Sequence, residues 1–135
     1  MTPPTRLVIA LTIAGGFFLS IGCQTRPGPA DDPAAVALDA SRSHADRLAA
    51  IDRLDPRVAA SHRSALRRLV FDDHRPHPQR ALALERWIAT DEAAARSALR
   101  HQLHRIDQWP MLRHALDVIV AHGWRDTARG VVLSW

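Results

Sequence analysis

Residues 79–106 read QRALALERWIATDEAAARSALRHQLHRI, and this stretch decides the fold class. Its apolar residues recur every three or four positions, a spacing that places them on one face of an α-helix. In the second half, the residues of that face are Ala95, Leu99, Leu103 and Ile106. Between the two apolar runs, residues 90–92 (Thr-Asp-Glu) put acidic side chains where a helix starts, which favours the helix dipole. The stretch therefore predicts two helices, one reaching about residue 89 and the next starting at residues 90–92.

The same helical spacing extends outward from this stretch, from Ala34 to the end of the chain, without a convincing alternating segment. Asp32-Pro33 and Asp55-Pro56 each place a capping carboxylate before a proline at the first helical position. Gly123 is the expected C-terminal cap of another helix. We predict six helices: about 34–54, about 56–71, one after the break at 75–78, one from 90–92, one from about 109 to before 123, and one from 126.

The predicted helices form antiparallel pairs that recur along the chain. Asp55, Asp91 and Asp126 begin the second helix of each pair, at spacings of 36 and 35 residues. Two-helix units of about 35 residues are typical of tetratricopeptide, HEAT and armadillo-like arrays. The tetratricopeptide signature residues are missing, and an Asp before a helix rich in Arg and Ala resembles the HEAT-like repeats of bacterial proteins. The resemblance implies a HEAT-like right-handed α-solenoid over residues 34–135, and a small helical bundle is the alternative all-α architecture.

The charge of the chain argues against a nucleic-acid partner. All 18 basic residues are Arg, they face 14 acidic residues, and the formal net charge is only +4. A nucleic-acid site needs basic residues that cluster on one surface, whereas this mild excess is spread along the chain. A hydrophobic content of 47% also excludes a wholly disordered protein.

The first 22 residues have the features of an export signal. An uncharged apolar run from Leu7 to Ile21 is shorter than the ~20 residues that a membrane-spanning helix needs. The run ends in LSIGC at residues 19–23, and Cys23 is the only cysteine. This motif resembles the lipobox of bacterial lipoproteins, although the commonest version has Leu where this chain has Ser20. The resemblance implies cleavage before Cys23, which then carries a diacylglyceryl thioether and an N-acyl chain such as palmitate. An uncleaved anchor and an ordinary secretory signal are the alternatives.

Residues 23–33 are the predicted link between the lipid anchor and the fold. From Gln24 to Pro33 there are three Pro, one Gly and no large apolar residue, a composition typical of an extended tether. Gln24 directly follows the cysteine. In Gram-negative bacteria an Asp at that place tends to retain a lipoprotein at the inner membrane. The resemblance therefore implies an outer-membrane lipoprotein that faces the periplasm.

Histidine is unusually frequent, with eight residues in the chain. The pairs His74-x-x-His77 and His101-x-x-His104 have spacings compatible with metal binding, but zinc needs three or four convergent ligands. On the helical pattern the second pair lies opposite the apolar face, beside arginines that would repel a cation. His62 falls on the apolar side of its helix, so we expect a hydrogen-bonded core residue. A His-rich metal-binding or metal-sensing protein of the periplasm is the alternative function.

Catalytic motifs are absent from the sequence. It contains no His-Glu-x-x-His, no Gly-x-Ser-x-Gly and no glycine-rich phosphate loop. Ser61, His62 and Asp72 supply the residue types of a hydrolytic triad, but such sets arise by chance in a helical chain of this composition. We predict that the protein is not an enzyme, and we assign no catalytic residue, no metal ligand and no cofactor.

The four tryptophans divide into two predicted groups. Trp87 and Trp109 follow the apolar faces of their helices, which predicts core positions. The other two lie in a turn and near the chain end. Aromatic residues and Arg are enriched at binding hot spots. The predicted partner-binding residues are Trp124, Arg125, Arg129 and Trp135.

The second predicted helix also carries a basic stripe, formed by Arg63, Arg67 and Arg68. Such a stripe is commonly a solvated face, and in a tethered protein it can rest on anionic lipid headgroups. Taken together, the sequence predicts a membrane-anchored lipoprotein of the bacterial cell envelope. Its helical-repeat domain serves as a protein–protein interaction scaffold or accessory subunit. The expected partners are the membrane, through Cys23, and an envelope protein or a second copy of the chain.

Overall fold

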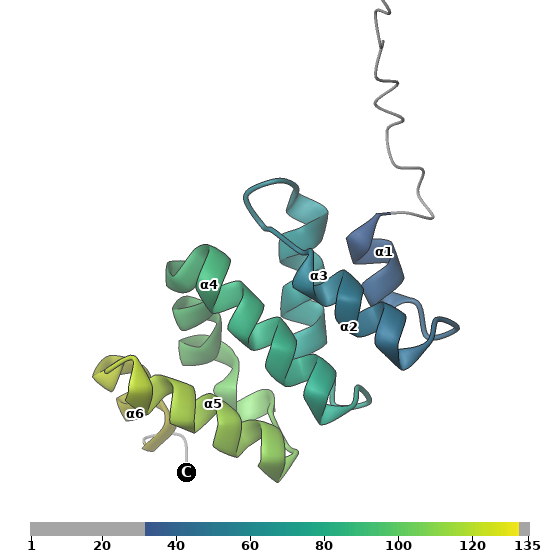
Figure 1. The fold of residues 1–135 in the computed structure, drawn as a ribbon. Helices are drawn as coiled ribbons and strands as arrows, with labels where there is room; N and C mark the ends of the chain where they lie inside the picture. Colours follow the sequence, from purple (N-terminus) through teal and green to yellow (C-terminus); the bar gives the residue numbers. More distant parts are fainter. Residues whose placement is uncertain (1–31, 133–135) are drawn as a thin grey trace, which may run out of the picture.

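A computed structural model describes residues 32–132, with side chains as far as Arg129. Within this range the chain forms six α-helices and one short 3-10 helix, η1 (Figure 1). The elements are α1 (Pro33–Leu38), α2 (His44–Asp52), α3 (Ala60–Phe71), α4 (His77–Gln102), η1 (Leu103–Arg105), α5 (Trp109–Ala121) and α6 (Arg125–Val132). The all-α class is confirmed, in the form of a small bundle of six helices.

Several predictions from the sequence concern residues outside the described part. The signal peptide (1–22), the lipidated Cys23, the tether as far as residue 31, and Trp135 all fall there. Among the described helices, none is both long enough and apolar enough to span a bilayer.

The long helix α4 lies at the centre of the bundle. It packs against α2 and α3 on one side and against α5 and α6 on the other (Figure 1). Leu84, Trp87 and Leu99 of α4 are buried, as the helical spacing of the sequence predicts. Burial of such apolar surface is the main favourable contribution to folding. Elements that are distant in sequence therefore meet on this one helix.

Two helix ends form as their sequences predict. The carboxylate of Asp32 accepts a hydrogen bond from the backbone N–H of Ala34 (3.1 Å), with Pro33 at the first position of α1. At the end of α5, Gly123 has a φ of 65°, a conformation that suits glycine. The N–H of Gly123 donates to the carbonyl of Val120, and the N–H of Trp124 donates to that of Ile119. This pair of bonds is a Schellman motif, which turns the chain back toward the bundle.

The predicted break at residues 90–92 is also confirmed. Asp91 has non-helical dihedral angles (φ −153°, ψ 74°) in the middle of α4. Its carboxylate accepts a hydrogen bond from the N–H of Ala94 (3.2 Å), as an N-cap does. Helix α4 therefore consists of two segments that meet at Asp91, and the second segment starts where the acidic residues indicate.

The prediction of one helix over 34–54 is wrong, because residues 39–43 interrupt it. The carboxylate of Asp39 accepts hydrogen bonds from the N–H (2.9 Å) and hydroxyl (2.7 Å) of Ser41, which closes a turn. Ser43 then caps α2. Its hydroxyl oxygen accepts a hydrogen bond from the backbone N–H of Asp46 (3.0 Å), and its O–H donates to the carboxylate of Asp46 (2.7 Å). Short polar side chains that bond to nearby backbone favour turns and caps over a helix interior.

The prediction that a helix starts at residue 56 is wrong by four residues. Asp55 does not cap a helix; its carboxylate instead accepts hydrogen bonds from the backbone and side chain of Arg57. The N–H of Val58 donates to the carbonyl of Asp55 (3.0 Å), which makes a separate turn. Helix α3 begins only at Ala60.

Candidate functional site

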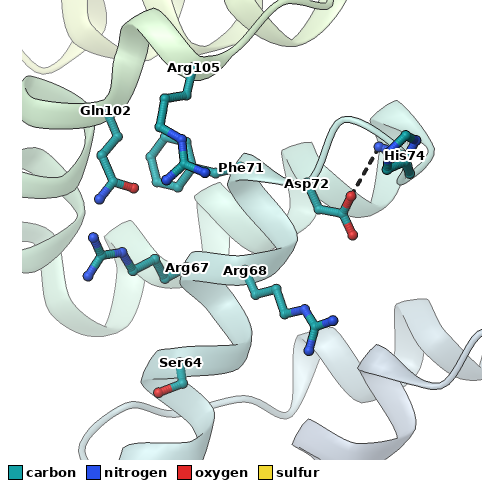
Figure 2. A pocket seen from close by; sticks show the side chains of 8 residues that line it. All are labelled: Ser64, Arg67, Arg68, Phe71, Asp72, His74, Gln102 and Arg105. Carbon is teal, nitrogen blue, oxygen red and sulfur yellow. Dashed lines mark hydrogen bonds between the residues drawn. The ribbon is translucent and has the colours of Figure 1, made fainter.

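A cationic hollow lies between the C-terminal half of α3 and the end of α4. It has a volume of about 570 Å³. Its lining residues are Ser64, Arg67, Arg68, Phe71, Asp72, His74, Gln102 and Arg105 (Figure 2). Figure 2 shows Arg67 extending toward Gln102, and Arg68 extending away from it.

A second hollow of about 380 Å³ adjoins the first, since Ser64, Arg67 and Gln102 line both. Its other lining residues are Arg63, Trp87, Ala94, Ser97, Ala98 and His101. We call the two adjoining hollows the arginine groove. The groove thus joins a cationic end, near Arg105 and His74, to an end with more apolar lining, near Trp87 and Ala98.

The helical repeat of α3 explains why its arginines line the groove. The buried residues of α3 are His62, Ala65, Leu66, Leu69 and Val70. Arg63, Arg67 and Arg68 occupy the intervening positions, where the 3.6-residue repeat turns them away from the core. Their side chains are exposed, so the predicted basic stripe of this helix is present.

Three arginines of the groove have no carboxylate partner in the described part of the chain. No described Asp or Glu oxygen lies within 4.0 Å of the guanidinium groups of Arg67, Arg68 or Arg105. When the amide of Gln102 is oriented with its oxygen toward Arg67, that oxygen accepts hydrogen bonds from the Arg67 guanidinium. Because the amide is neutral, the positive charge of Arg67 stays uncompensated. The carboxylate of Asp72 already accepts from Arg75 Nε (3.3 Å) and from the N–H of His74 (3.1 Å).

Seven of the other thirteen described arginines are paired with a carboxylate. Seven guanidinium groups lie within 4.0 Å of a carboxylate, namely those of Arg42, Arg57, Arg63, Arg75, Arg80, Arg96 and Arg100. The pair of Arg63 with Asp91 is the loosest, at 3.8 Å. What distinguishes the groove is that three arginines without a carboxylate partner line the same hollow.

One of the four predicted partner-binding residues is buried in the bundle. Trp124 is only 3% exposed, and its indole N–H donates to the carboxylate of Glu92 (3.1 Å). The prediction that it offers a free ring in a turn is corrected, because the Schellman turn directs it into the core. Arg125 and Arg129 are exposed on α6. Their role stays a prediction, and Trp135 lies outside the described residues.

Trp109 was predicted to lie in the core, but its side chain lies on the surface. Trp87 is buried as predicted, but Trp109 is 65% exposed. The buried residues of α5 are Met111, Ala115 and Ile119. At 100° per residue, Trp109 lies about 120° from the centre of that stripe. The apolar pattern therefore indicated a face that is rotated from the one the bundle buries.

The histidines are divided among several places. His62 is a buried, hydrogen-bonded residue as predicted: its Nδ1 accepts from the N–H of Asp55 (3.0 Å), and its Nε2 lies 3.3 Å from Asp32 Oδ1. With both ring nitrogens so engaged, His62 is not part of a triad with Asp72. His101 and His104 are exposed, as expected.

Metal-ligating side chains do not gather in the described part of the chain. Within it, no three His, Cys, Asp or Glu residues are arranged to hold a metal ion. His77 instead meets His114 edge to face, with ring centroids 6.0 Å apart. His114 Nε2 lies 3.5 Å from Glu85 Oε1.

The sequence predicted only the α3 side of the arginine groove. It identified the stripe on α3, but it did not connect the stripe with Arg105, Gln102 or His74. The signal in the sequence was the polar face of the helix after residue 91, which carries His101 and is followed by Gln102 and Arg105.

Comparisons with protein-family models, with curated proteins and with solved structures gave no match to this chain.

Proposed function

We propose that this chain is a lipid-anchored protein of the bacterial envelope whose helical domain binds a partner protein through the arginine groove. The observation that carries the interaction role is the set of uncompensated guanidinium groups in a hollow between two helices. Arg presents several N–H donors in a planar fork that suits carboxylates. It is also enriched at the energetic centres of protein interfaces.

The anchoring role is supported by the sequence at the N-terminus. The LSIGC motif at residues 19–23 resembles a lipobox, and Asp32, which caps α1, lies nine positions after Cys23. At about 3.3–3.6 Å per residue, a fully extended tether of this length reaches about 30 Å. The domain would stay near the membrane surface, and its partner would be a membrane protein or a protein held close to the membrane.

The decisive experiment is affinity capture from gently solubilised envelopes, with partner identification by mass spectrometry. The groove variant carries Arg67→Glu and Arg105→Glu. Its matched control carries Arg125→Glu and Arg129→Glu, the same change of charge on the exposed face of α6. We expect the wild type and the control to retain one specific partner, and the groove variant to lose it. Near-UV circular dichroism and the melting temperature establish that both variants are folded.

Other outcomes would contradict separate parts of the proposal. Loss of the partner only in the α6 variant would move the interface to the residues first predicted from the sequence. Equal capture by all three proteins would overturn the role of the groove. Labelled palmitate that enters the wild type and Cys23→Ser equally would overturn the lipid anchor.

A further inference from the structure

We infer that the arginine groove is a two-part site for an extended acidic peptide segment, with carboxylates at its cationic end and an apolar side chain at the Trp87 end. This inference rests on the proposed function, because it names the kind of partner that the groove would take. The two ends differ in chemistry, and that difference indicates which kind of ligand side chain lies at each end.

The charge of the cationic end favours a ligand with acidic side chains. Arg67, Arg68 and Arg105 line it without a described carboxylate within 4.0 Å. His74 lines the same end and is exposed. A carboxylate here would accept charge-assisted hydrogen bonds, which are the stronger class. Asp72 is the one acidic lining residue, and its oxygens are already bonded to Arg75 and to the N–H of His74.

The lining of the other end suits an apolar side chain of the ligand. Ala94, Ala98 and the almost fully buried Trp87 line it. The indole N–H of Trp87 is buried and has no acceptor in the described part of the chain. Such an unpaired buried donor is unfavourable, and it belongs to a side chain that lines this end of the groove.

The middle of the groove suits a polypeptide better than a membrane surface. Ser64 and Gln102, which line both hollows, carry neutral groups that can bond to peptide N–H and C=O groups. The site is hollowed between two helices, whereas a bilayer surface meets side chains that protrude. Along α3, residues 63 to 71 span about 12 Å, the length of roughly four residues of an extended chain.

The test is a titration of the purified full-length chain in detergent with a fluorescein-labelled peptide, Ser-Glu-Glu-Asp-Leu-Ser. We expect saturable binding that weakens about tenfold or more for the Arg67→Glu, Arg105→Glu variant, because two charge-assisted contacts are lost. The Arg125→Glu, Arg129→Glu variant should bind like the wild type. A peptide with Gln and Asn in place of its acids should also bind about tenfold more weakly.

The apolar end has its own readout. Replacement of the peptide Leu by Ser should weaken binding several-fold, and the wild-type peptide should shift the indole N–H resonance of Trp87 in NMR spectra. The Trp87→Phe variant assigns that resonance. If removal of the Leu has no effect and the resonance does not move, the two-part site is wrong, and only a nonspecific cationic surface remains.

A membrane ligand is tested in parallel with phosphatidylglycerol vesicles. Groove-dependent binding to these vesicles without binding to the peptide would overturn the inference in favour of lipid headgroups.

Different results would contradict the inference and the proposed function. Capture of a partner that depends on the groove, without peptide binding, would leave the proposed function and remove the acidic peptide. Peptide binding with no partner captured would leave the acidic-peptide site and contradict the proposed function.

Discussion

The two ends of the contact between α3 and α4 use the same residue type in different ways. Where α4 begins, Arg80 is fully buried; its Nε donates to the carbonyl of Val70 (3.0 Å), and its Nη1 lies 2.8 Å from Asp73 Oδ1. Where α4 ends, Arg67 and Arg105 line an open groove and have no described carboxylate partner. One region uses arginine to hold two helices together, and the other leaves it available to a ligand.

The difference shows that pairing and burial, not composition, decide what an arginine does. A buried guanidinium without a carboxylate is costly, so Arg80 requires Asp73. An exposed guanidinium carries no such cost, and removing it should hardly change stability. The same contrast separates the tryptophans, because Trp124 lies in the core and Trp109 lies on the surface.

The largest effect should come from the tryptophans. We expect Trp124→Ala to lower the free energy of unfolding by about 3–5 kcal/mol, because it leaves a cavity in the core. Trp109→Ala should change that free energy by no more than about 0.5 kcal/mol, because the side chain is mostly exposed. Urea unfolding followed by far-UV circular dichroism measures both. Similar losses for the two variants would mean that the bundle buries α5 differently.

The arginine comparison should give the next largest effect. Asp73→Ala should lower the free energy of unfolding by about 2–3 kcal/mol, because it leaves the buried Arg80 without its counterion. Adding Arg80→Met should recover much of the loss, since the long apolar side chain fills the site without charge. Arg67→Ala is the control and should cost at most about 0.5 kcal/mol. No recovery in the double variant would show that Asp73 acts through something other than Arg80.

The smallest effect concerns the bonded pair of a partly buried Asp55 and an exposed Arg57. In the turn before α3, the side chain and backbone N–H of Arg57 bond to Asp55 and lower the pKa of that carboxyl from 3.8 to about 2. The folded state thus favours the ionised form. The resulting contribution to stability is present above about pH 4 and is lost as the pH falls toward 2.

Asp55→Asn should therefore show a shallower loss of stability between pH 5 and pH 2 than the wild type. Urea unfolding at several pH values measures the slope. Asp107→Asn, at an exposed position before α5, is the matched control for the removal of one carboxylate. An unchanged slope for Asp55→Asn would indicate that the bonds to Arg57 are not maintained in solution.

Local chemistry made part of the fold predictable. The starts at Pro33 and Asp91 and the end at Gly123 depend on residues within a few positions of one another, and they form as expected. The turn at 39–43 depends on equally local bonds, and the sequence carries its signal in Asp39 and Ser43. That boundary was missed because the apolar spacing of residues 34–54 outweighed the turn chemistry.

Other features depended on residues far apart in sequence. Whether an aromatic side chain is buried depends on which face the neighbouring helices cover, and the spacing within α5 could not orient Trp109. The groove likewise joins Arg67 to Arg105, which lie 38 positions apart. A helical pattern identifies the polar face of each helix, but not which polar faces will meet.

By itself, the sequence determined the all-α class, most of the helix ends and the exposed stripe of arginines on α3. These follow from the 3.6-residue repeat and from capping residues that act within one or two turns. Only the tertiary structure decided that Trp124 is buried, that Arg80 is paired and that Arg67, Arg68 and Arg105 share one hollow. Those outcomes depend on how α4 packs against four other helices, because only packing brings distant side chains within the few ångströms over which they pair or exclude water.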